Sequence, residues 1–401
     1  MKKDKIISNL KLLAIYILTG IFCGIIGTLF SKGVYLVTNI RNSNPWLLYL
    51  LPLAGVVSVA VYKMLKVTDM GTNQVLKSAD GEQALSSKLV PAVFFASILS
   101  HLCGASVGRE GAALQLGGGT ATFFSNRFKL TESQRKIMIY CGMAGVFSSV
   151  FGTPFTAAVF ALEVVFVGKI FYPAIASVFI SSFTSYFTSI LLGAHPEQLV
   201  LAEIPKINFY VIVKLVAISL LTIIVSIVFC LALKYFERLF KKFIANDFLR
   251  IVVGAVIIIL LTIVVGTYDY NGTGMHVIKR VFDKNEFVPY AFVLKILFTA
   301  VCVGVGYKGG EIVPTLFIGA TFGALVGSVL GLPIPFAAAF CMICLFCCVT
   351  NCPIASILLA VELFSSKGVL YIAIGVVITY FLSGKTGLYS DQKTKGFKSL
   401  F

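Results

Sequence analysis

Long apolar runs dominate this chain, and the first of them extends from Leu10 to Phe30. An apolar run of about 20 residues has the length of a helix that crosses a bilayer. Hydrophobic residues make up 58% of the 401 residues, and the mean hydropathy is +0.96. A water-soluble fold of this length needs more polar surface than this composition supplies. Because the runs are too long for barrel strands, the sequence predicts an all-α polytopic membrane protein.

The N-terminus resembles a signal peptide, because Lys2, Lys3 and Lys5 precede the first apolar run. The run from Leu10 to Phe30 is too long for the apolar part of such a peptide, and no clean small-residue cleavage site follows it. We therefore interpret this segment as the first membrane helix, retained in the protein.

The formal net charge is +16, from 33 Lys and Arg against 17 Asp and Glu. Nucleic-acid binding would require these charges on one soluble face with aromatic residues between them. They lie instead at the ends of apolar runs, as the positive-inside rule describes. The sequence therefore predicts a lipid bilayer and no nucleic acid as partner. We expect a multi-pass protein of the cell (inner) membrane, with its basic N- and C-termini in the cytoplasm.

The chain contains an internal repeat, in which residues 151–163 align with residues 350–362. The second copy carries closely spaced cysteines, a pattern that resembles metal or iron–sulfur ligation. Gly, Ser and Thr occupy the equivalent positions of the first copy, so packing of small side chains in a membrane helix explains the cysteines better. We expect no metal site and no cofactor. These cysteines are Cys341, Cys344, Cys347, Cys348 and Cys352.

The repeat is inverted. The run from Leu10 to Arg41 aligns with the run from Phe209 to Phe240, and their basic flanks lie at opposite ends. Lysines precede the first run, whereas basic residues follow the second and acidic residues precede it. The charges around the second run are Glu197, Glu203, Lys234, Arg238, Lys241 and Lys242. By the positive-inside rule, the two helices cross the membrane in opposite directions.

This repeat divides the chain into a first half, residues 1–193, and a second half, residues 208–384. We expect residues 194–207 to form an extracellular linker, and residues 385–401 to form a short helix followed by a basic cytoplasmic tail. Inverted repeats place their substrate sites near the membrane midplane, between discontinuous helices. The fold therefore predicts a secondary transporter or a channel derived from one.

Residues 108–111 (Gly-Arg-Glu-Gly) lie between two apolar stretches, in a chain of which 12% is charged. Ionisable groups in hydrocarbon cost roughly 2.5–3.5 kcal/mol each, so they are rarely present there without a function. The glycines permit a broken helix whose N–H groups face an anion. Glu110 is our candidate gating and proton-coupling residue, because an ionised carboxylate occupies an anion site and a protonated one leaves it. We expect no ion pair with Arg109, since adjacent helix residues do not face each other.

Four motifs, in order, resemble those of the CLC family of anion channels and anion/proton antiporters. Residues 71–75 (Gly-Thr-Asn-Gln-Val) lie in the place of the family's GSGIP, and residues 108–112 in that of GREGP. Residues 308–314 (Lys-Gly-Gly-Glu-Ile-Val-Pro) lie in that of GGxFxP, and Tyr389 in that of the anion-contacting tyrosine. The resemblance implies a CLC-type inverted-topology repeat with many tilted and broken helices, and a homodimer with a separate pore in each subunit.

The departures from these motifs narrow the function. Thr72 and Asn73 replace Ser and Gly, and Ala112 replaces Pro. Val164 takes the place of the internal glutamate of the family's chloride/proton antiporters, while Glu311 adds a carboxylate to the third motif. This combination resembles the fluoride-exporting branch, which exchanges fluoride for protons. Chloride/proton exchange and a passive anion channel are the alternatives, and no motif indicates an enzyme.

Several further residues are candidates for the anion and proton paths. Tyr389 can donate a phenolic hydrogen bond to an anion without adding a charge. Glu311 is either a second proton-path carboxylate or a carboxylate held by helix N-terminal amides. Thr72 and Asn73 offer donors to an anion that must lose its water, although Thr72 can also cap a helix. The remaining expected anion-binding residues are Gly111, Ile312 and Val313.

Three other polar residues fit structural roles better. Glu163 and Glu362 occupy equivalent positions at the ends of repeat-related helices, so we expect them to serve the fold or the cytoplasmic surface rather than the proton path. His101 lies alone in an apolar run, which favours a packed, hydrogen-bonded side chain over a proton relay.

Overall fold

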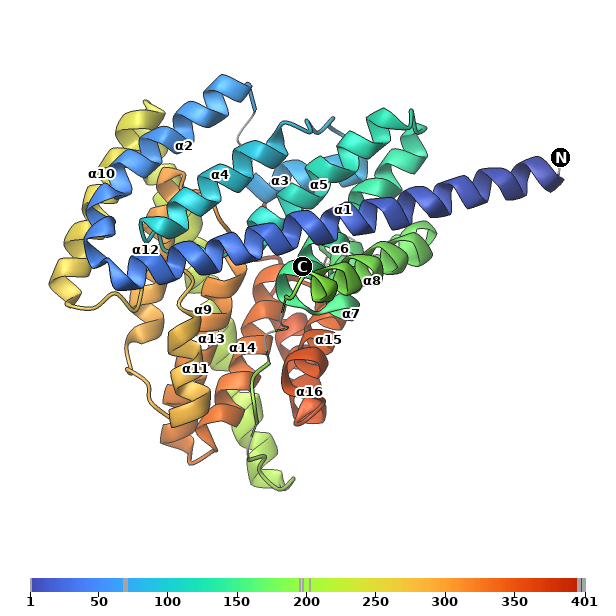
Figure 1. The fold of residues 1–401 in the computed structure, drawn as a ribbon. Helices are drawn as coiled ribbons and strands as arrows, with labels where there is room; N and C mark the ends of the chain where they lie inside the picture. The colour runs from blue at the N-terminus through green and yellow to red at the C-terminus, as the bar shows by residue number, and fades with distance from the viewer. Residues whose placement is uncertain are drawn as a thin grey trace.

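The structure, a computed structural model, describes residues 2–67, 71–194, 196, 198–201, 203–394 and 398. Glu197, which was part of the predicted acidic flank, lies outside the described residues. Over the described residues the fold is almost wholly α-helical, which confirms the predicted fold class. Figure 1 shows the blue to cyan helices α1, α2 and α4 of the first half in the upper part of the view and the red helices α15 and α16 of the second half in the lower part, while α10, in yellow, lies beside α2.

The first half contains eight of the described α-helices and the segments that join them. The elements are α1 (Lys2–Ser43), η1 (Pro45–Leu50), α2 (Leu51–Leu65), α3 (Gly71–Asp80), α4 (Leu89–Leu102), α5 (Glu110–Arg127), α6 (Glu132–Phe151), α7 (Pro154–Val164), β1 (Phe166–Val167), η2 (Tyr172–Ala174) and α8 (Ile175–Leu191). Proline begins α7, where its missing N–H costs no helical hydrogen bond.

The second half repeats this pattern with eight further described helices. The elements are α9 (Phe209–Phe243), α10 (Asp247–Val265), α11 (Met275–Lys284), α12 (Ala291–Val305), α13 (Ile312–Leu330), α14 (Ile334–Thr350), α15 (Pro353–Phe364), α16 (Val369–Leu382) and β2 (Lys393–Thr394). Proline again begins α15, the repeat partner of α7.

Six segments of the described chain are long and apolar enough to cross a membrane. They are Asn9–Ser43, Pro45–Leu65, Tyr172–Leu191, Phe209–Phe243, Asp247–Val265 and Ile312–Leu330. The chain also contains shorter apolar helices, among them α7, which lies between the second and third spans, and α15, which follows the last. Helices too short to cross a bilayer alone are the broken helices that an inverted repeat uses to build a site at the midplane.

Small residues let the central helices pack closely. A Cβ atom on Gly117 of α5 would overlap the backbone of Gly142 in α6, and one on Gly142 would overlap Gly117. In the second half, a Cβ on Gly319 of α13 would lie 2.8 Å from the carbonyl oxygen of Cys341 in α14. Close backbone approach of this kind drives helix association in membranes. All ten cysteines are buried and unpaired.

Glu163 and Glu362 cap helices of the opposite half. The Glu163 carboxylate accepts hydrogen bonds from the N–H groups of Ile354 (3.2 Å) and Ala355 (2.9 Å), at the start of α15. The Glu362 carboxylate accepts from Phe155 (3.0 Å) and Thr156 (2.8 Å), at the start of α7. A negative charge is stabilising at a helix N-terminus. The predicted structural role is therefore confirmed, and the two contacts are related by the inverted repeat.

The C-terminal segment returns to the first half of the chain. Its short strand β2 pairs in parallel with β1, with Phe166 opposite Lys393 and Val167 opposite Thr394. Tyr389 lies in an irregular segment of turns after α16, where a short helix was expected. Gly384, with φ of +64°, leaves the helical conformation just before it. Residues 395–397 and 399–401 of the predicted tail lie outside the described residues.

Candidate anion and proton site

The two glycine clusters of the repeat meet in an antiparallel bridge. The N–H of Gly108 donates to the carbonyl of Gly310 (2.5 Å), and the N–H of Gly310 donates to the carbonyl of Gly108 (2.7 Å). α5 starts two residues after Gly108, and α13 two residues after Gly310. The bridge therefore brings the N-terminal ends of two helices from opposite halves to one place, where their dipoles favour an anion.

Glycine is needed on both sides of this bridge. A Cβ on Gly310 would overlap the backbone nitrogen of Gly111, and a Cβ on Gly111 would lie 2.9 Å from the Cα of Gly310. That Cβ on Gly111 would also lie 3.2 Å from the hydroxyl oxygen of Thr72. Thr72, near the start of α3, thus adds its hydroxyl and a third helix N-terminus to the site.

Glu110 lies between these helix ends and is fully buried. Its Oε2 accepts hydrogen bonds from the backbone N–H groups of Arg109 (3.0 Å) and Val313 (3.3 Å). The carboxylate is therefore bound by main-chain donors from both halves. Such donors bind an anion without adding a positive charge. Glu110 and Val313 are brought together as expected, and the carboxylate takes the position that an anion would prefer.

The expectation that Arg109 and Glu110 form no ion pair is wrong. The Nε of Arg109 lies 3.5 Å from the Oε1 of Glu110. Arg109 is the residue before α5, with φ of −109° and ψ of −11°, so the spacing rule for side chains inside a helix does not apply to it. Its Nη1 also donates to the hydroxyl of Ser31 on α1 (3.0 Å).

Glu311 takes the equivalent position before α13, with φ of −101° and ψ of −8°. Its expected role as a second proton-path carboxylate stays a prediction. Ile312, the next residue, is fully buried and begins the helix.

Tyr389 is 6% exposed, and its hydroxyl has no hydrogen-bond partner among the described residues. The N–H of Leu388 donates to the carbonyl of Val349 (2.8 Å), which fixes this segment against the end of α14. A buried hydroxyl without a partner is a donor available to an anion.

Asn73 contacts the tyrosine segment. Its Nδ2 donates to the hydroxyl of Ser390 (3.2 Å), and its Oδ1 accepts from the N–H of Asp391 (3.4 Å). Lys77, one turn along α3, forms an ion pair with Asp391 (3.3 Å). These contacts hold the segment that carries Tyr389 against α3, and the expected role of Asn73 as a direct donor to the anion stays a prediction.

Gln392 is a residue that the motifs did not indicate. Its Nε2 donates to the carbonyl of Val164 (2.9 Å), at the end of α7, and to the carbonyl of Thr350 (2.8 Å), at the end of α14. The Val164 side chain is fully buried. The resemblance implies a glutamate at this position in chloride/proton antiporters, whereas this chain has the apolar Val164. We call the two hydrogen bonds from the Gln392 amide to the ends of α7 and α14 the clasp.

Two buried polar residues lie away from the bridge. His101 bonds the carbonyl of Ser97 through Nδ1 (2.8 Å), which confirms the predicted packed side chain. Lys295 of α12 was not singled out in the sequence, although it is alone in an apolar run. It is fully buried and donates to the carbonyls of Tyr270 (3.1 Å) and Gly272 (2.7 Å). Backbone carbonyls thus stabilise this lysine in the structure.

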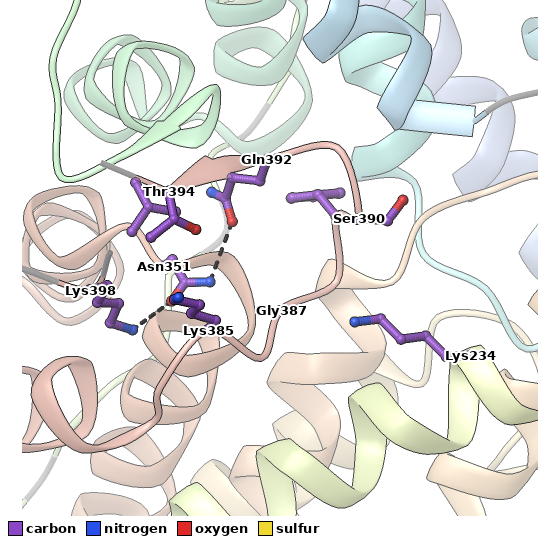
Figure 2. Close-up of a pocket in the computed structure, with 10 residues that line it drawn as sticks. Lys234, Asn351, Lys385, Gly387, Ser390, Gln392, Thr394 and Lys398 are labelled. Atoms are coloured by element: carbon purple, nitrogen blue, oxygen red, sulfur yellow. Dashed lines mark hydrogen bonds between the residues drawn. The ribbon is translucent and has the colours of Figure 1, made fainter. Parts of the chain in front are cut away.

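A cavity of about 190 Å³ lies beside Tyr389, and we call it the lysine cavity. Lys234, Lys385 and Lys398 contribute to its walls, as Figure 2 shows. A second space, of about 20 Å³, lies between Arg109, Val313 and apolar side chains. That volume holds about one water molecule. Glu110 is therefore near a narrow apolar space, and Tyr389 is near a wide polar one.

The comparisons with known proteins agree on one family. Residues 53–384 match the voltage gated chloride channel family. A chloride/fluoride channel protein of Pseudomonas syringae pv. tomato is 30% identical, over 96% of this chain and 86% of the relative. The H+/Cl− exchange transporter ClcA of Vibrio cholerae is 23% identical, over 100% of this chain and 92% of the relative.

Solved structures have the same fold. The crystal structure of a CLC-type fluoride/proton antiporter matches with a TM-score of 0.91 and 30% identity, over 96% of this chain and 98% of that chain. A slow cyanobacterial Cl−/H+ antiporter matches with a TM-score of 0.77 and 18% identity, over 93% and 94% of the two chains.

Proposed function

This chain belongs to the voltage gated chloride channel (CLC) family, and from that premise we propose that it is a secondary transporter that exports fluoride in exchange for protons. The observation that carries the proposal is the position of Glu110. Its buried carboxylate accepts N–H groups from the start of α5 and from Val313 of α13, as a transported anion would.

Exchange follows from competition for these N–H groups. An ionised Glu110 occupies the donors and blocks the path. A protonated Glu110 is a poor ligand for helix N-termini, so an anion displaces it. Each anion that enters thus favours protonation of Glu110, and each proton that Glu110 releases lets its carboxylate bind the N–H groups again. This competition couples the two ions without a separate gate.

Several features favour fluoride as the anion. Fluoride is small and strongly hydrated, so its site must replace several water hydrogen bonds at once. Thr72 and Tyr389 offer hydroxyl donors, in addition to the main-chain N–H groups. Val164 provides no carboxylate at the position of the family's internal glutamate, whereas Glu311, directly before α13, provides one. A relative and a solved structure whose names include fluoride are each 30% identical to this chain over the aligned residues.

We further propose that the protein works as a homodimer with one path in each subunit, located in the inner membrane. The basic ends of the chain and of α9 favour cytoplasmic termini under the positive-inside rule. Glu311 would then pass protons between Glu110 and the cytoplasm.

The test is an assay of purified protein in liposomes. Fluoride efflux down its gradient should drive proton uptake against a proton gradient. Glu110→Gln should abolish proton uptake, while Glu286→Gln, at an exposed carboxylate, should leave it intact. Fluoride flux without proton movement would identify a passive channel, and chloride-driven proton uptake without a fluoride response would identify the chloride/proton alternative.

A further inference from the structure

The helix α11 lays an apolar face on the second half of the fold. α9 ends in basic residues on the cytoplasmic side and α10 crosses the membrane, so α11 begins at the extracellular side under the proposed orientation. It packs against α13 and α14 (Figure 1). Its buried residues form one helical stripe, and they are Val277, Ile278, Val281 and Phe282. Its opposite face is exposed and carries His276, Lys279 and Asp283.

The start of α11 reaches the residues that bind Glu110. Met275 and Ile278 line the space of about 20 Å³ that Arg109 and Val313 also line. The N–H of Val313 donates to the Glu110 carboxylate (3.3 Å), and the Nε of Arg109 lies 3.5 Å from the same carboxylate. The space therefore lies between the outer helix α11 and the two residues that hold Glu110.

Two further apolar side chains line this space, Leu199 from the linker and Leu363 from α15. The N–H of Leu199 donates to the carbonyl of Leu363 (3.1 Å), which fastens the linker to α15. We call Met275, Ile278, Leu199 and Leu363 the outer seal. A small space with apolar walls offers too few polar partners to hold water, and a dry apolar constriction is a barrier to ions. An ion that leaves Glu110 in this direction must therefore displace the outer seal.

Polar contacts hold α11 from outside the seal. Asp269, in the loop before α11, is hydrogen-bonded to His276 (3.0 Å) and pairs with Arg280. The same loop is joined to the segment that precedes Glu110, because the Nδ2 of Asn271 donates to the carbonyl of Gly104 (3.1 Å). The pair of Asp269 with α11 is partly exposed, so it can open without exposing a buried charge. The loop thus links the position of α11 to the segment that leads to Glu110.

We propose that Met275 and Ile278 close the path between Glu110 and the extracellular side, and that an ion crosses this point only when α11 moves away from Arg109 and Val313. The pair of Asp269 with α11 holds the helix in the closed position. This inference rests on the proposed function only in requiring that an anion passes Glu110. It holds equally for an exchanger and for a channel.

The first experiment adds a hydroxyl to the seal and measures fluoride efflux and proton uptake in liposomes. Ile278→Thr should raise fluoride efflux by roughly fivefold, the effect of one net hydrogen bond on a barrier, and should lower the proton-to-fluoride ratio. Val277→Thr is the matched control, because Val277 is buried on the same helix and does not line the space. Parental efflux in Ile278→Thr, or an equal change in both variants, overturns the proposal.

The second experiment detects the movement of α11. A membrane-impermeant methanethiosulfonate reagent, applied from the extracellular side, should label Ile278→Cys faster during fluoride transport than without fluoride. Adding Asp269→Asn should speed this labelling about two- to fivefold, the range for a surface ion pair. Asp283→Cys, on the exposed face, should be labelled equally under all conditions, and the parental chain reports on its ten buried cysteines. An Ile278→Cys that is never labelled, or is labelled at one rate throughout, contradicts a moving seal.

The two proposals fail separately. A parental chain that moves fluoride without protons contradicts exchange, and the seal is then tested by fluoride efflux and labelling alone. Coupled transport with parental efflux in Ile278→Thr and no change in labelling contradicts the seal and leaves exchange in place. Circular dichroism and detergent elution of each variant confirm that the chain is folded.

Discussion

The hydroxyl of Tyr389 is a single atom whose loss can be tested without changing the packing. Tyr389→Phe keeps the buried ring and removes the donor that has no partner among the described residues. A hydrogen bond to a charged group contributes about 1.5–3 kcal/mol, so we expect fluoride transport to slow by roughly 10- to 150-fold. The measurement is the initial rate of fluoride efflux. Tyr210→Phe, at an exposed ring, is the control, and an unchanged rate in Tyr389→Phe rules out the donor role.

Residues differ in how far the sequence reveals them. The Gly-Arg-Glu-Gly motif is local, so Glu110 could be assigned to a helix start from sequence alone. The roles of Asn73, Gln392 and Lys398 depend on where the C-terminal segment returns, which no local pattern encodes. The Arg109 contact was missed because a rule for helix interiors was applied to a residue that precedes the helix.

At the scale of elements, the reciprocal caps on α7 and α15 stabilise the contact between the two halves. Glu362→Ala removes a carboxylate that accepts two N–H groups and the hydroxyl of Thr156 (2.5 Å). We expect the free energy of unfolding to fall by about 1–3 kcal/mol, with the proton-to-fluoride ratio unchanged. Thermal unfolding in detergent gives the first value, and Glu286→Ala is the control. An unchanged midpoint would show that the cap is dispensable.

The segment between α10 and α11 makes a pH-dependent contribution. His276, hydrogen-bonded to Asp269 (3.0 Å), and Arg280 lower the pKa of Asp269 below its ordinary value of 3.8. A carboxylate with a lowered pKa in the folded state stabilises it above pH 3.8, and this contribution is lost as pH falls through the folded-state pKa. Asp269→Asn should therefore lower the unfolding midpoint at pH 7, and the difference should vanish in strong acid. A difference that is independent of pH would contradict this assignment.

Elements were predictable from sequence to the extent that they are long or repeated. The apolar runs of α1 and α9 and their opposite basic flanks predicted two helices that cross in opposite directions. The break before α13 could be placed by aligning Glu311 with Glu110. The short helix expected after residue 385 is not formed around Tyr389, because Gly384 leaves the helical conformation before it and Leu388 hydrogen-bonds to the carbonyl of Val349.

At the scale of the whole molecule, the path depends on two contacts between distant parts of the chain. The bridge between Gly108 and Gly310 joins the halves at the centre. The clasp of Gln392 on the ends of α7 and α14 then holds the Tyr389 segment across the same boundary. The bridge sets where Glu110 binds, and the clasp sets where Tyr389 lies relative to it.

The clasp can be tested separately from the bridge. Gln392→Ala leaves two helix-terminal carbonyls without their donor and releases the segment that carries Tyr389. We expect slower fluoride transport and a lower proton-to-fluoride ratio, because an anion could then pass without displacing Glu110. Lys393→Gln is the matched neighbour, since its ammonium pairs with Asp80 and Glu82 at the surface, where ion pairs contribute little. If both variants keep the parental ratio, positioning of Tyr389 does not depend on the clasp, and the contacts of Asn73 must suffice.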